Sequence, residues 1–74
     1  MKIRATKTEK VKGFKVIQEL SKSDTEYSRI STVDISETPF PYIVEIFKLE
    51  EGEFRYKTGN AFKKIEEAQD YINH

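Results

Sequence analysis

The spacing of the apolar residues changes once along this chain, and that change limits the folds it can adopt. Up to residue 57 apolar side chains tend to alternate with polar ones, as in strands, and after Thr58-Gly59-Asn60 they recur at helical spacing. The 74 residues include 18 β-branched side chains (eight Ile, four Val and six Thr) but two Leu. β-branched residues favour pleated strands over helices. A chain of this length buries one small core, so we expect one domain over residues 1–74.

Four segments have the alternation or the β-rich composition of strands: Val11–Leu20, Tyr27–Ile35, Tyr42–Leu49 and Phe54–Lys57. Within the first of them, Gly13 predicts a bulge or a bend. The last two are joined by a short glycine-containing turn and are predicted to form a β-hairpin over residues 42–57. Between the second and third segments lies Thr38-Pro39-Phe40-Pro41, which predicts a loop because proline has no N–H for a strand ladder.

The C-terminal segment predicts one amphipathic helix, with Phe62, Ile65 and Ile72 on its apolar face and Asn60 as its N-cap. A helix of about three turns is marginal alone in water, so we expect it to lie across the sheet. The sequence therefore predicts an α+β fold, a three- or four-stranded antiparallel sheet with one C-terminal helix packed on one face. The other face is expected to be open, and residues 1–9 to form either a basic arm or an extension of the first strand.

The chain offers few groups for catalysis or metal binding. It has no Cys, and its one His is His74 at the chain end, four residues after Asp70. Two such side chains do not make a structural metal site, which normally needs four protein ligands. Glu50, Glu51 and Glu53 flank a turn that we expect to be exposed, where nothing would raise the pKa of one carboxyl. We therefore expect no enzymatic activity, no catalytic residue, no metal and no cofactor.

Nothing in the sequence indicates export or membrane insertion. The basic residues near Met1 are followed by no apolar stretch, and no apolar run approaches 18 residues. The expectation is a soluble, cytoplasmic protein.

Charge is balanced overall but is distributed in blocks. The 13 basic and 13 acidic side chains cancel, yet the first 15 residues hold six basic residues against one acidic residue. A second basic group, expected where the hairpin meets the first turn of the helix, places lysines against the helix dipole and suggests an anion site. Nucleic-acid binding is therefore the alternative function, and its candidate residues are Lys2, Arg4, Lys7, Lys10, Lys12, Lys15, Arg55, Lys57, Lys63 and Lys64. The simpler interpretation is that these lysines keep edge strands soluble and separate.

The leading function is a small non-enzymatic binding or regulatory module that acts through protein–protein contacts. The open sheet face or a sheet edge would form the contact surface, either with a protein partner or with a second copy of the chain. The candidate contact residues are the aromatic side chains Tyr27, Phe40, Tyr42 and Tyr56.

Overall fold

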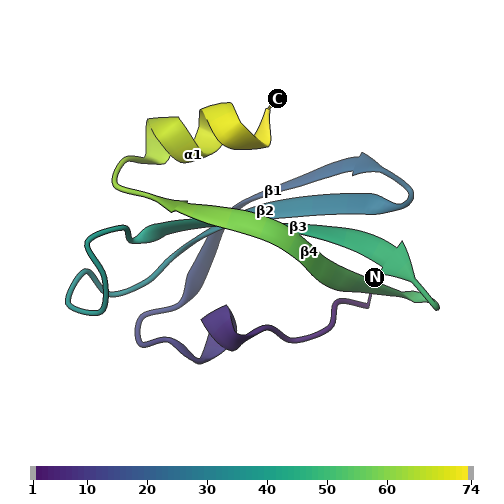
Figure 1. Cartoon of the computed structure of the whole chain (residues 1–74), viewed down its shortest axis with the longest axis horizontal. Coiled ribbons are helices and arrows are strands. Elements are labelled where there is room, and N and C mark those ends of the chain that lie inside the picture. Colours follow the sequence, from purple (N-terminus) through teal and green to yellow (C-terminus); the bar gives the residue numbers. More distant parts are fainter. Residues whose placement is uncertain (1, 74) are drawn as a thin grey trace.

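The computed structural model, which describes residues 2–73, shows a four-stranded antiparallel sheet with one C-terminal helix and confirms the expected α+β class (Figure 1). The strands β1 (Lys15–Ser23), β2 (Glu26–Thr32), β3 (Tyr42–Glu50) and β4 (Glu53–Phe62) pair in chain order. The helix α1 (Ile65–Ile72) follows β4. His74, the only imidazole of the chain, lies outside the described residues.

The predicted hairpin is present and is longer than expected. Glu51 and Gly52 both have positive φ, 51° and 81°, as the two central residues of a type I′ turn require. β4 then continues to Phe62, so Thr58-Gly59-Asn60 is strand, in register with residues 44–46 of β3. The prediction of Asn60 as the helix N-cap is therefore wrong, because pairing with β3 overrides the turn-like composition of this segment. The helix begins only after Lys64.

Irregular pairing is confined to the two edge strands. Ile17 and Lys22 are extra residues in β1 relative to β2, and Lys57 is an extra residue in β4 relative to β3. The inner pair of strands, β2 and β3, keeps an unbroken register from Glu26 opposite Lys48 to Thr32 opposite Tyr42. Bulges in edge strands locally disrupt the ladder and discourage edge-to-edge pairing with other chains.

The N-terminal segment, defined here as residues 2–14, is mostly not strand. It contains a short 3₁₀ helix over Lys7–Lys10 and a turn at Gly13, whose φ is 80°, and β1 begins at Lys15 rather than at Val11. The backbone N–H of Asp34 donates to the carbonyl of Lys12 at 2.9 Å. A Cβ at Gly13 would lie 2.7 Å from the Asp34 nitrogen, so glycine is needed here for a tight turn and not for a bulge.

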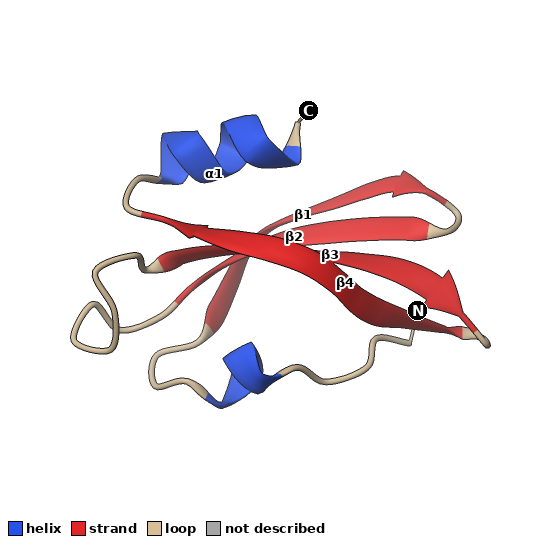
Figure 2. Ribbon diagram, in the orientation of Figure 1, coloured by secondary structure: helices blue, strands red, loops and turns tan. Residues whose placement is uncertain are grey.

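The two faces of the sheet are covered by different parts of the chain. α1 lies on one face, where Ile30, Val44, Ala68 and Ile72 are fully buried. The N-terminal segment lies on the other face, with its short helix on the opposite side of the sheet from α1 (Figure 2). There Ile3 packs against a cluster of three buried aromatic residues, which are Tyr27, Phe47 and Phe54.

The prediction of an open face is therefore wrong, and β2 shows why. Tyr27, Ser28, Arg29, Ile30 and Ser31 are all buried although they alternate between the two faces. A strand buried on both sides needs a cover on both sides. This also explains why apolar residues of β2, Tyr27 and Ile30, stand on both of its faces.

β2 ends three residues earlier than predicted. After Thr32 the chain turns, with the N–H of Val33 donating to the Pro41 carbonyl at 3.1 Å and the N–H of Ser36 to Asp34 Oδ1 at 3.0 Å. The second bond is the side-chain turn typical of Asp. Among residues 2–73, no helix has the length and the apolar character that crossing a bilayer requires.

Candidate functional site

A buried ion pair joins the two central strands on the face covered by the N-terminal segment. Arg29 on β2 and Glu45 on β3 are register partners and are 4% and 2% exposed. Arg29 Nε and Nη2 each lie 2.9 Å from Glu45 Oε1. Charged side chains are almost never buried unless they are paired, so each of these two residues explains the burial of the other.

The same arginine holds the N-terminal segment on the sheet. Arg29 Nη2 donates to Thr6 Oγ1 at 3.4 Å, and Nη1 lies 3.8 Å from Glu9 Oε1. The guanidinium also lies 5.3 Å from the ring centre of Phe14 and 5.0 Å from that of Phe47. Thr6 precedes the short helix, Glu9 lies within it and Phe14 follows it, so Arg29 contacts the N-terminal segment at three separate points.

Glu9 has a second role in the same segment. Its Oε2 accepts the backbone N–H of Thr6 at 2.7 Å, and together the two residues form a capping box at the start of the 3₁₀ helix. Glu9 therefore stabilises the start of the same short helix that places its side chain near Arg29.

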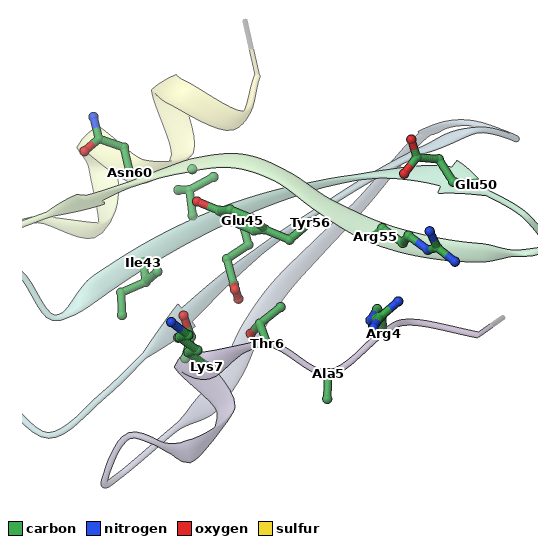
Figure 3. A pocket seen from close by; sticks show the side chains of 13 residues that line it. Arg4, Ala5, Thr6, Lys7, Ile43, Glu45, Glu50, Arg55, Tyr56 and Asn60 are labelled. Atoms are coloured by element: carbon green, nitrogen blue, oxygen red, sulfur yellow. The ribbon is translucent and has the colours of Figure 1, made fainter.

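A cavity of about 790 Å³ lies between the N-terminal segment and the strands β3 and β4. We call it the groove, and its lining comprises residues 4–8, residues 43–45, Glu50, Arg55, Tyr56, Gly59 and Asn60. Figure 3 shows Arg4 and Arg55 together at one end, Lys7 and Ile43 at the other, and Glu45 and Tyr56 between them. Ligand pockets in proteins commonly have about 300–1,000 Å³, so the groove is large enough to hold a ligand.

Tyr56 forms one wall of the groove. The ring is 51% exposed and stands edge-on against Phe47, with 6.3 Å between ring centres and 83° between ring planes. Gly59, two residues after the bulge in β4, is the register partner of Glu45. A Cβ at Gly59 would clash with the Val44 carbonyl and would lie 3.3 Å from the Tyr56 hydroxyl, so only glycine fits beneath this ring.

The acidic side chains of the groove are held by cations. Glu45 is bound by Arg29, and Glu50 accepts a hydrogen bond from Lys57 Nζ at 2.5 Å. This bond lowers the pKa of the Glu50 carboxyl below its usual value. The Glu50 carboxylate therefore stays ionised near neutral pH.

The basic side chains of the groove differ in how closely their positive charge is paired with a carboxylate. Arg55 Nε lies 2.9 Å from Glu53 Oε1, and this hydrogen bond lowers the pKa of Glu53 and raises that of Arg55. Arg4 Nη1 lies 3.5 Å from the same oxygen. Lys7 forms no ion pair with any residue of the described chain. The positive charge available to a ligand is therefore concentrated at Lys7 and, in part, at Arg4.

The structure brings some of the predicted contact residues together and separates others. Tyr56 lies in the groove, whereas Phe40 is 42% exposed in the loop between β2 and β3, with Lys63 Nζ 5.5 Å from its ring centre. Tyr42 is half-buried on the face covered by α1.

Tyr27 is 2% exposed, so its prediction as a surface contact is wrong: its ring belongs to the second core cluster. Its hydroxyl donates to Glu19 Oε1, and burial, reinforced by this bond, raises the pKa of the Tyr27 phenol above its usual value.

The basic residues predicted to form an anion site divide into separate groups. Arg55 and Lys57 lie near the hairpin turn, and Lys63 lies eight residues beyond Arg55, or about 26 Å along a strand. Lys63 and Lys64 also precede the helix, whose first turn carries Glu66 and Glu67 as the helix dipole favours. The expected cluster is therefore absent from the described residues, because β4 is long and straightens the segment that was predicted to turn.

The basic residues of the N-terminal region differ in their partners. Arg4 and Lys7 line the groove, and Lys12 Nζ lies 3.9 Å from Asp34 Oδ2. Within residues 2–73 no ion pair is formed by Lys2, Lys10, Lys15 and Lys64.

Of the residues that line the groove, the sequence analysis named Arg4, Lys7, Arg55 and Tyr56 as candidates. It missed the polar residues Thr6, Thr8, Glu45, Glu50 and Asn60, and it also missed the anchoring residue Arg29. One signal was available: Glu45 is the one acidic residue inside the most apolar stretch of the chain, Tyr42–Leu49. A charge in such a strand needs a buried partner of opposite sign, and Arg29 is the one cation in the facing segment Glu26–Thr32.

Comparison with protein-family models, with curated proteins and with solved structures finds no significant match to this chain. The residues and geometry of the groove therefore carry the functional argument.

Proposed function

We propose that this chain is a non-enzymatic protein-binding module and that a segment of its partner occupies the groove. The observation that supports this most is the position of Tyr56, a half-exposed aromatic ring that forms the wall of a cavity of about 790 Å³. Aromatic side chains in such positions bury much area at little cost in conformational entropy, and they dominate binding at protein interfaces.

The state of the carboxylates supports recognition over catalysis. Glu45 and Glu50 are each held by a cation of the chain, so both carboxylates are already occupied by contacts within the protein. The arrangement fixes the shape of the groove instead, since Arg29 ties the segment on one side to the strands on the other.

The charge balance favours a protein partner over a nucleic acid. Nucleic-acid domains commonly carry a strong net positive charge, whereas this chain has 13 basic and 13 acidic side chains. Arg55 and Lys57 are bound to glutamates of the same hairpin, so a phosphate backbone would have to displace those carboxylates.

Peptides selected from a phage-displayed random dodecamer library would test the proposal, with binding measured by fluorescence anisotropy. We expect Tyr56→Ala to weaken binding by at least about tenfold, as loss of a central aromatic contact does. Phe40→Ala is the matched control, because Phe40 is similarly exposed but lies outside the groove, and it should leave affinity unchanged.

Two results would overturn the proposal. One is that Phe40→Ala abolishes peptide binding while Tyr56→Ala does not. The other is that no peptide is selected, while single-stranded DNA or RNA binds with an affinity that falls steeply as salt is raised.

A further inference from the structure

We propose that the partner segment is an acidic, extended peptide that adds to β4 as a further strand and bonds to the backbone of Gly59 and Ala61. This inference rests on the proposed function and specifies how the groove would be used.

The chain itself already uses the edge of β4 in this way, but only at its start. Phe54 N–H donates to the Lys2 carbonyl at 2.9 Å, and Arg4 N–H donates to the Phe54 carbonyl at 2.9 Å, so Ile3 and Phe54 form a parallel bridge. The N-terminal segment then leaves the edge. Beyond Phe54, no other segment of residues 2–73 pairs with β4 on this side.

The direction of the backbone amides shows which residues of β4 face the open edge. The N–H of Ala61 donates to the side-chain Oδ1 of Asn60 at 2.9 Å, so it points away from β3. Amides in a strand alternate in direction, which places Gly59 on the open side as well. The bulge at Lys57 shifts this alternation by one residue, which agrees with Phe54 facing the same edge.

The regular part of β4 beyond the bulge is long enough to accept a strand. Thr58 to Phe62 pair without interruption with Ile46 to Tyr42, so five consecutive residues present an ordered edge. The other edge strand, β1, is interrupted by two bulges, at Ile17 and Lys22. Of the two edges, that of β4 is therefore the better template for strand addition.

The charge of the groove selects an acidic occupant. Both carboxylates of its lining are already bound by cations, whereas Lys7 forms no ion pair among the described residues and Arg4 has one at 3.5 Å. An acidic side chain of the peptide near Lys7 would gain an ion pair without breaking one. A peptide also supplies N–H and C=O groups that can pair with Gly59 and can replace Asn60 Oδ1 as the acceptor of the Ala61 N–H, whereas a phosphate backbone supplies no such ladder.

The test is an N-methyl scan of the peptides selected by phage display, measured by anisotropy on the wild-type protein. Strand addition predicts that methylation weakens binding at every second position, by about fivefold for each lost hydrogen bond. It also predicts that the selected peptides are acidic. The Lys7→Glu variant should then bind these peptides at least about tenfold more weakly than the wild type. Lys15→Glu is the matched control, since Lys15 lies outside the groove and also forms no ion pair among residues 2–73.

A protein variant tests the same contact from the other side. Ala61→Pro removes the outward N–H, which in this structure donates to Asn60 Oδ1, and leaves the charges of the groove intact. Proline is tolerated in an edge strand where the N–H takes no part in the ladder. We expect it to weaken peptide binding by at least about fivefold.

The outcomes separate this inference from the proposed function. If Tyr56→Ala weakens binding but the N-methyl scan shows no alternation, the groove binds peptides and strand addition is wrong. If the selected peptides are basic or neutral, the acidic specificity is wrong. If peptides bind independently of Tyr56, both proposals are wrong.

Discussion

The two faces of the sheet are closed in different ways, and the difference locates the groove. On the face covered by α1, Ile30 and Val44 pack against Ala68 and Ile72, and all four are fully buried apolar residues. On the other face, aromatic rings surround a buried ion pair that ties down a segment with little regular structure. Apolar packing by a helix leaves little space, whereas a segment anchored at a few points leaves a cavity between its anchors.

The largest effect should come from breaking the ion pair of the second face. Glu45→Leu leaves the Arg29 guanidinium buried without its partner, and we expect the free energy of unfolding to fall by about 3–5 kcal/mol. Urea unfolding followed by circular dichroism measures this loss. Ile30→Val, a conservative change on the face covered by α1, should cost only about 1 kcal/mol.

The double variant Arg29→Met/Glu45→Leu sharpens the comparison. Replacing both charges by apolar groups removes the unpaired charge, so stability should return to within about 1 kcal/mol of the wild type. Should the double variant stay as unstable as Glu45→Leu, the anchoring contacts of Arg29 with the N-terminal segment would matter more than the pair itself.

A smaller effect on the free energy of unfolding is expected at high pH, where the Tyr27 phenol ionises. Because its pKa is raised in the folded protein above the ordinary value of 10.0, folding favours the neutral phenol. The resulting stability is present below pH 10.0 and is lost as pH rises further. We expect Tyr27→Phe to cost about 1 kcal/mol at neutral pH, for the lost hydrogen bond to Glu19.

Urea unfolding at a series of pH values from neutral to alkaline measures this dependence. Above pH 10.0 the wild type should lose stability more steeply than Tyr27→Phe. Parallel pH profiles of the two proteins would show that Tyr27 is not the group responsible.

The smallest effect should come from Glu9, which caps the 3₁₀ helix and approaches Arg29. Glu9→Ala should lower stability by about 0.5–1 kcal/mol, as the loss of a cap does. Hydrogen exchange should accelerate in the N-terminal segment and not in α1. Glu37→Ala, an exposed acidic residue in the loop between β2 and β3, is the control; equal acceleration in both variants would contradict the anchoring role.

The sequence predicted the parts of the fold that local patterns determine. Gly52 is the residue type that a type I′ turn favours at its second central position, and the residues that flank the turn alternate, so the hairpin could be predicted. The continuation of β4 could not, because Thr58-Gly59-Asn60 resembles a turn locally and is strand only through its register with β3.

The candidate site was predictable in part. Blocks of charge identified Arg4, Lys7 and Arg55, and exposed aromatic character identified Tyr56, but nothing local indicated that these residues share one groove. Their proximity depends on the packing of the N-terminal segment, which has no regular periodicity. That packing depends in turn on Arg29 and Glu45, which come together only when β2 and β3 pair.

The strand order β1-β2-β3-β4 also has a consequence for the order of folding. Every strand pairs with its neighbour in the chain, so the sheet can form through short-range hairpins. The bridge between Ile3 and Phe54 instead joins residues that are 51 positions apart in the sequence and should form last. Changes at Ile3 should therefore accelerate unfolding and leave the folding rate almost unchanged.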